Sequence, residues 1–237
     1  MNSYRSTLIS LALMTSTVLA GSEPDPFIWL EEVEGQRPLE WVEKHNKIAI
    51  GELTGDPRYE EIREGLLAVY NSRDRIPAVT RHGDYYYNFW QDADHVRGIW
   101  RRCSPESYAT AEPEWETVFD VDALAEAEEV SWVWKGATVQ DIDHSRALLR
   151  LSDGGQDASE YREFDLQSLE FIEDGFKLSS ARNRADWIDA DTLLVGAFPR
   201  DDDATDSGYP RRTRIWQRGT PIEDAKIVHE IDPKKVG

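Results

Sequence analysis

A serine nucleophile would need a recognisable setting in this sequence. In α/β-hydrolases the serine stands on a strained turn between a strand and a helix, which requires the pattern Gly-x-Ser-x-Gly. Gly51 and Gly55 are the only glycines four residues apart in the 237-residue sequence, and the residue between them is Leu53. The sequence therefore contains no serine elbow, and we assign no catalytic residues to it.

Histidine and carboxylate residues give no recognisable metal site either. The five histidines form no His-Glu-x-x-His pattern, which would place two imidazoles on one helix face. Residues 92–95 and 141–144 each read Asp-x-Asp-His, but they fall at different places in the strand pattern and would not share a site. Residues 201–206 resemble a calcium loop, but they lack its sixth-position glycine and twelfth-position glutamate. We predict a solvated acidic loop there, no metal and no cofactor.

The composition excludes several classes of partner and site. Lysine and arginine number 27 and aspartate and glutamate 46, so the net charge is −19. Such a chain lacks the basic face that a nucleic-acid backbone requires. The single cysteine, Cys103, excludes an internal disulfide and a cysteine-rich zinc site, and we expect a small buried residue there. Nine tryptophans and nine tyrosines favour a β-rich protein.

Residues 1–20 have the features of a signal peptide. Arg5 gives a positive start, residues 8–20 are apolar apart from serines and threonines, and Val18-Leu19-Ala20 ends the run at a cleavage-like position. The apolar run is shorter than the ~20 residues that a membrane-spanning helix needs. We predict cleavage after Ala20 and export to the periplasm or the medium, with no membrane span.

The remaining sequence changes character near residue 76. Residues 21–75 read as a helical segment: Leu39, Val42 and Asn46 share one face with Ile50 and Leu53, and a second helical pattern ends near Asn71. Residues 76–237 read as short strands separated by turn residues.

The strands fall into groups that repeat. The equivalent second strands are 85–90, 147–151 and 192–198, the third strands are 98–102, 161–166 and 213–217, and the fourth strands are 115–120, 169–172 and 225–231. A spacing of about 45 to 65 residues is typical of four-stranded propeller blades with loops. An antiparallel sandwich is the alternative, and the period alone does not separate the two.

A short aromatic stretch near the N-terminus reads as a docking segment. It runs Asp25-Pro26-Phe27-Ile28-Trp29-Leu30-Glu31, and Trp41, Val42 and Asn46 follow on a helix. Large aromatic side chains at this density need a surface to bury against. This stretch resembles the N-terminal signature of the prolyl oligopeptidase family of serine peptidases. The resemblance continues at residues 73–77, which look like the hinge into the propeller, and at 86–98, 151–157 and 185–191, which look like its first three blades.

The resemblance implies a mainly β fold, a partial seven-bladed β-propeller preceded by a short helical segment. In the family that segment packs on an α/β-hydrolase domain, which cleaves short proline-containing peptides while the propeller screens access. This chain resembles the N-terminal segment and about three blades, so we expect it to be inactive alone and to meet peptide substrates through the missing hydrolase domain.

One residue is a candidate for the substrate channel. Asp157 lies in the loop that matches the second blade, a region that can face the catalytic domain, although a plain turn aspartate is the simpler interpretation. The alternative function is a non-catalytic propeller-type binding module. About three blades would leave large unpaired strand edges, which favours a portion of a peptidase over such a module.

Cleavage of the predicted signal peptide can be tested directly. Expressed with its own N-terminus in a bacterial host, the chain should lose residues 1–20, because the short apolar run ends in a cleavage-like position. Intact-mass analysis should find a protein that begins at Gly21. Leu11→Arg, which interrupts the apolar run, should block processing. A mature protein that still begins at Met1 would contradict the prediction.

Overall fold

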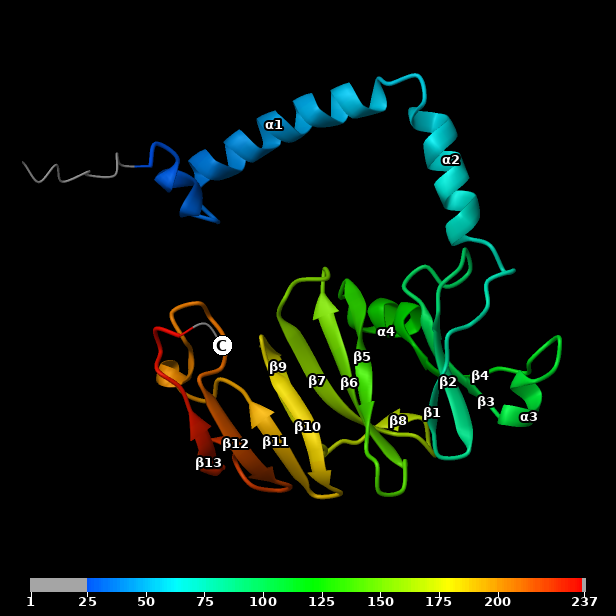
Figure 1. The fold of residues 1–237 in the computed structure, drawn as a ribbon. Helices are drawn as coiled ribbons and strands as arrows, with labels where there is room; N and C mark the ends of the chain where they lie inside the picture. Colours follow the sequence, from blue (N-terminus) through cyan, green and yellow to red (C-terminus); the bar gives the residue numbers. More distant parts are fainter. Residues whose placement is uncertain (1–24, 236–237) are drawn as a thin grey trace, which may run out of the picture. The chain divides into compact units, whose positions relative to one another are not determined.

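The computed structural model describes residues 25–235 (Figure 1). The predicted signal peptide lies outside these residues. The chain divides into two compact units, and the division falls between Arg63 and Glu64. Within residues 25–235 no helix is both long and apolar enough to cross a bilayer.

The predicted helical segment is confirmed as three separate helices. They are η1 (Ile28–Glu31), α1 (Gln36–Thr54) and α2 (Tyr59–Tyr70). Before α2, the Asp56 carboxylate accepts a hydrogen bond from the Arg58 amide at 2.9 Å, as expected of an aspartate that begins a helical turn. The predicted common face of α1 is confirmed for Leu39, Val42, Asn46 and Ile50, which line one shallow surface, whereas Leu53 does not line it.

The aromatic residues of the first unit pack partly on α1 itself. The rings of Trp29 and Trp41 lie edge to face with centroids 6.4 Å apart, and the Arg37 guanidinium lies 3.9 Å from the centre of the Trp29 ring. Phe27 and Ile28 stay more than half exposed. The two tryptophans therefore have partners of their own, while the apolar surface beside them is open to a further contact.

The second unit contains three antiparallel sheets, and the strands of each follow the chain order, except that β9 pairs with β7 beside β8. This simple up-and-down order is that of propeller blades and differs from the Greek-key order of most sandwiches. The strands are, in the first sheet, β1 (Thr80–His82), β2 (Tyr85–Trp90), β3 (Ile99–Cys103) and β4 (Glu116–Asp120); in the second, β5 (Trp132–Val139), β6 (Arg146–Asp153), β7 (Ser159–Asp165), β8 (Glu170–Phe171) and β9 (Lys177–Ala181); and in the third, β10 (Arg184–Asp189), β11 (Thr192–Gly196), β12 (Arg212–Gln217) and β13 (Lys226–Glu230).

The predicted grouping of strands is confirmed. The expected second strands are β2, β6 and β11, the expected third strands are β3, β7 and β12, and the expected fourth strands are β4, β8 and β13. Two strands were not predicted: β1 has only three residues, and β9 buries only Leu178. Four short helices also interrupt the strand region, namely α3 (Pro105–Tyr108), α4 (Val121–Glu128), η2 (Asp201–Asp203) and η3 (Ile222–Asp224).

Helix α4 was also not predicted, although its start carries a clear signal. The Asp120 carboxylate accepts a hydrogen bond from the Ala123 amide at 3.0 Å, which satisfies one free donor at the helix N-terminus. Val121 and Ala125 then turn into the core. Glu126, Glu128 and Glu129 follow, so this short segment has too few apolar residues for a helical pattern to be recognised in the sequence.

The second sheet is buried on both faces. Leu149 and Leu151 of β6 face an apolar cluster shared with the first sheet, whereas Leu148 faces a cluster shared with the third. Side chains alternate along a strand, so one strand supplies both layers. Each fully buried leucine contributes about 1.5–3 kcal/mol by its removal from water.

Hydrogen bonds join neighbouring sheets across these layers. Arg102 of β3 donates to the Leu166 carbonyl at 2.7 Å, and the indole of Trp187 in β10 donates to the Thr138 carbonyl at 2.9 Å. An ion pair between Glu163 and Arg218 also joins the second and third sheets. Glu163 of β7 is buried, and its carboxylate accepts two hydrogen bonds from Arg218, at 2.7 and 2.8 Å.

Glu163 also organises its own sheet. It lies where the fourth strand breaks into β8 and β9, and its carboxylate accepts a hydrogen bond from the Phe176 amide at 2.7 Å. A Cβ atom at Gly175 would stand 2.9 Å from the Glu163 Cβ, so the loop closes over the carboxylate only with glycine there. One side chain therefore shapes the strand break and binds the next sheet.

The ion pair leads to a stability prediction. Removing one partner of a buried pair costs about 3–5 kcal/mol because the other charge loses its compensation. Arg218→Met should lower the free energy of unfolding by up to about that amount, since Arg146 still lies 3.4 Å from the buried Glu163 carboxylate. Glu163→Gln should lower it by less, because the partly exposed Arg218 keeps Asp191 as a partner. Urea denaturation followed by tryptophan fluorescence measures both changes.

The matched control is Asp94→Asn. Asp94 pairs with Arg73, and both side chains are largely exposed, so its loss should cost less than about 1 kcal/mol. Equal effects for Asp94→Asn and Glu163→Gln would show that the buried pair does not hold the sheets. The double variant Glu163→Gln/Arg218→Met should be less destabilised than the sum of the single variants.

Candidate functional site

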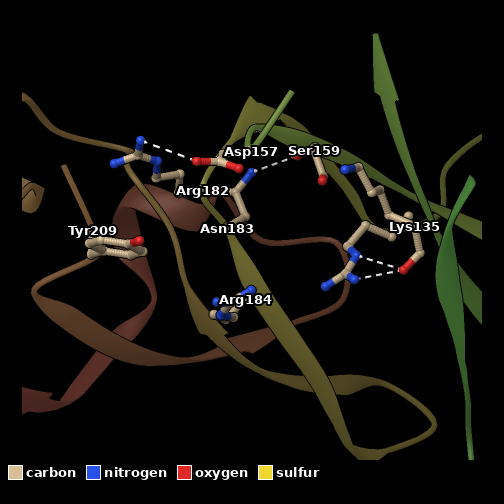
Figure 2. A pocket seen from close by; sticks show the side chains of 8 residues that line it. Lys135, Asp157, Ser159, Arg182, Asn183, Arg184 and Tyr209 are labelled. Atoms are coloured by element: carbon tan, nitrogen blue, oxygen red, sulfur yellow. Dashed lines mark hydrogen bonds and ion pairs between the residues drawn. The ribbon is translucent and has the colours of Figure 1, made fainter. Parts of the chain in front are cut away.

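A cavity lies where the second and third sheets meet. Its volume is about 230 Å³, and eight residues line it: Lys135, Arg150, Asp157, Ser159, Arg182, Asn183, Arg184 and Tyr209 (Figure 2). They come from β5 and β6 and from the places where β6 gives way to β7, β9 to β10 and β11 to β12. The loops that join β6 to β7 and β11 to β12 lie on the upper side of the sheets in Figure 1.

Asn183 fixes the connection between the two sheets. It is buried, and its amide nitrogen donates to the Ser179 carbonyl at 2.6 Å and to the Ser159 carbonyl at 3.4 Å. The Tyr161 hydroxyl donates to the Asn183 carbonyl at 3.3 Å. The two neighbours of this anchored residue, Arg182 and Arg184, are thereby held at the cavity (Figure 2).

The cations of the cavity bind mostly to backbone carbonyl groups. Lys135 Nζ donates to the Gly155 carbonyl at 3.0 Å, and Arg150 donates to the Lys135 carbonyl at 2.6 and 3.1 Å. Arg182 donates to the Ser207 carbonyl at 2.9 Å, with its guanidinium 5.0 Å from the centre of the Tyr209 ring. Carbonyl groups orient these side chains without neutralising them.

The predicted substrate-channel residue lies at this cavity. Asp157 Oδ2 is 3.5 Å from Arg182 Nη2, and the Asp157 side chain is 82% exposed. Asp157 is the one carboxylate in the lining. An exposed carboxylate at this distance screens Arg182 weakly, because water surrounds the pair. The role of Asp157 in a substrate channel stays a prediction.

Comparison with known proteins identifies this arrangement of sheets. The chain matches the sequence model of the prolyl oligopeptidase N-terminal beta-propeller domain over residues 19–236. The chain belongs to the prolyl oligopeptidase family. It is 39% identical over 214 residues to the uncharacterized peptidase y4nA of Sinorhizobium fredii (strain NBRC 101917 / NGR234), covering 90% of this chain and 29% of that one.

Two further comparisons agree. The chain is 30% identical over 216 residues to the uncharacterized peptidase RP174 of Rickettsia prowazekii (strain Madrid E), covering 87% of this chain and 30% of the relative. The structure of a post-proline cleaving enzyme from Rickettsia typhi superposes with a TM-score of 0.81 at 28% identity, covering 89% of this chain and 32% of that one. The chain thus spans less than a third of the length of each of these proteins.

The family assignment confirms two expectations from the sequence. The recognised resemblance is correct, and the fold is that of a partial propeller with a helical N-terminal segment. The family is one of serine peptidases, and this sequence comprises only its N-terminal propeller portion. The packing of the helical segment on a hydrolase domain remains a prediction.

The two Asp-x-Asp-His segments, residues 92–95 and 141–144, lie in bends and turns between strands. Burial alone would raise the pKa of Asp92, but hydrogen bonds from Trp90, His95 and nearby amides hold that pKa well below its usual range. Asp143 binds Gln140 and the Ser145 amide. Among residues 25–235, no three histidine, cysteine, aspartate or glutamate side chains gather in a way that could hold a metal ion.

The prediction of a solvated acidic loop at residues 201–206 is confirmed for Asp201, Asp202 and Asp206, which are exposed, and is wrong for Asp203. Asp203 is fully buried and accepts hydrogen bonds from Arg214 at 2.5 Å and Arg212 at 3.0 Å. The two arginines alternate with Thr213 on β12, so they reach the loop from the same face of that strand. The expectation for Cys103 is confirmed, since it is buried and burial raises the pKa of its thiol.

Sequence reasoning missed the four cations of the cavity. Arg150 lies in the predicted second strand 147–151, and Arg182 directly follows β9, which was not predicted. Lys135 and Arg150 are brought together by the register of β5 against β6, which pairs Gly136 with Arg150 and which the sequence does not show. A sequence search could have singled out the closely spaced Arg182-Asn183-Arg184.

The missing serine elbow leads to a prediction for the purified chain. The 237-residue protein should not hydrolyse a proline-containing chromogenic peptide, because no serine lies in the setting that activates it. Serine-directed fluorophosphonate labelling followed by mass spectrometry provides the check. An active serine hydrolase treated in parallel serves as the positive control. Stoichiometric labelling of any serine in this chain would contradict the prediction.

Proposed function

We propose that this chain forms the N-terminal segment and first three blades of an exported serine endopeptidase that acts on short proline-containing peptides. The observation that carries the proposal is the run of three antiparallel sheets along the chain, two of four strands and one of five, together with the family match over residues 19–236. The relatives y4nA and RP174 are described as peptidases, and the Rickettsia typhi structure is described as a post-proline cleaving enzyme.

In the proposed enzyme the propeller portion restricts access. Blades packed through continuous apolar layers and joined by a buried ion pair form a stiff wall. A propeller encloses a narrow central channel, which admits an extended peptide and excludes a folded protein. The serine chemistry is supplied by a hydrolase domain, since this sequence carries no serine elbow.

A chimera tests the proposal. The matching N-terminal third of the Rickettsia typhi enzyme would be replaced by residues 21–237 of this chain, and cleavage of peptides would be followed by mass spectrometry. We expect cleavage after proline in peptides of about ten residues and no cleavage of a folded protein that carries the same sequence in a loop. The size limit follows from the channel, because a folded domain is wider than an extended chain.

Two controls keep the result interpretable. The same chimera with its nucleophilic serine replaced by alanine should be inactive, and the unaltered Rickettsia typhi enzyme should be active. A chimera that folds cooperatively and cleaves no proline-containing peptide would contradict the proposed function. A chimera that cleaves peptides and the folded substrate equally would contradict the role of the propeller in access.

A further inference from the structure

The cavity between the second and third sheets has a charge opposite to that of the chain. Four of its eight lining side chains are cationic and one is a carboxylate, whereas the whole chain has a net charge of −19. Most buried or half-buried arginines elsewhere in the second unit are bound to carboxylates. Examples are Arg162 with Glu128 and Glu160, Arg212 with Asp202 and Glu230, and Arg218 with Glu163 and Asp191.

Three of the four cavity cations have no such partner. Within residues 25–235, Lys135, Arg150 and Arg184 contact no carboxylate. Arg184 makes no side-chain hydrogen bond or ion pair with any of the described residues, and it is exposed at the cavity. In a chain with an excess of carboxylates, three neighbouring cations without a counter-charge mark a place for an anion from outside.

We propose that this cavity binds a carboxylate of the peptide substrate, with Arg184 as its principal ligand. An arginine guanidinium presents two parallel N–H groups that match the two oxygens of a carboxylate. Arg182 and Lys135 add positive charge around the same volume (Figure 2). The volume of about 230 Å³ accommodates the side chain of an aspartate or glutamate or a peptide C-terminus.

Asp157 competes with the incoming carboxylate. It lies 3.5 Å from Arg182 and its charge repels an anion at the cavity mouth. Asp157 therefore weakens the binding of an anion at this site, and removal of its charge should strengthen that binding. This outcome separates a binding site from a surface where Asp157 and Arg182 merely stabilise the loops, because a stabilising role would give lost stability and unchanged binding.

The inference rests on the proposed function for its peptide ligand, but it can be tested on the chain alone. The probes are proline-containing hexapeptides that differ only in glutamate against glutamine, each with an amidated C-terminus. A third probe is the glutamine peptide with a free C-terminal carboxylate. Isothermal titration at low salt gives the affinity of the 237-residue chain for each.

We expect the glutamate peptide to bind at least tenfold more tightly than its amidated glutamine counterpart. The free-acid glutamine peptide shows whether a C-terminal carboxylate substitutes for the side chain. Arg184→Gln should remove the preference, and Asp157→Asn should strengthen binding of the glutamate peptide severalfold. Each affinity should fall as salt screens the charges.

Arg81→Gln is the matched control. Arg81 is an exposed arginine on β1, so its removal changes the net charge equally without altering the cavity. Thermal melts should be similar for wild type, Arg184→Gln and Arg81→Gln, because Arg184 makes no side-chain hydrogen bond with residues 25–235. Equal affinity for the glutamate and glutamine peptides, an unchanged preference in Arg184→Gln, or no binding of any peptide would overturn the inference.

The two proposals fail separately. An active chimera whose propeller portion shows no preference for the glutamate peptide would leave the proposed function standing and overturn the carboxylate site. If the chimera were inactive while the 237-residue chain bound the glutamate peptide selectively, the carboxylate site would stand and the proposed function would be overturned.

Discussion

The buried carboxylate of Glu163 is the constraint on which the joining of the second and third sheets depends. A charge removed from water must be compensated by charge-assisted hydrogen bonds. Arg218 provides two of these and the Phe176 amide provides another. Apolar burial between the sheets is not directional, whereas a two-point contact between a guanidinium and a carboxylate is. We infer that the apolar layer supplies most of the stabilisation and that the ion pair selects the relative position of the sheets.

That relative position creates the cavity. Lys135 and Arg150 belong to the second sheet, Arg184 begins the third, and Arg182 lies on the connection that Asn183 anchors. None of these side chains would converge if the third sheet were shifted along the second. The anchoring contacts around Asn183 are made by backbone carbonyls, which hold the connection without neutralising the arginines beside it. At this junction Asn183 makes the stabilising contacts, and Arg182 and Arg184 supply the positive charge.

The distribution of charge links the fold to the activity proposed for the family member. Asp203 and Glu163 are fully buried in this acidic chain, and arginines bind both carboxylates. The cavity shows the opposite arrangement, since three of its four cations contact no carboxylate of the described residues and the fourth, Arg182, lies 3.5 Å from Asp157. Arg184 is exposed there, and in the proposed enzyme it would contact a peptide before any reaction on a separate hydrolase domain.

The sequence by itself determined the family, the helical start and the grouping of strands into repeating units, because turn residues and strand-length apolar runs are local signals. It missed β1, β9 and α4, whose short or weakly apolar stretches are defined by neighbouring strands and helix caps. It placed Asp157 as a candidate but gave no indication of the four cations around it. It also assigned Asp203 to solvent, where burial against Arg214 decides otherwise. Only the tertiary structure could decide these points, because a cavity and a buried ion pair are made by residues far apart in the chain, and their convergence depends on how whole sheets pack.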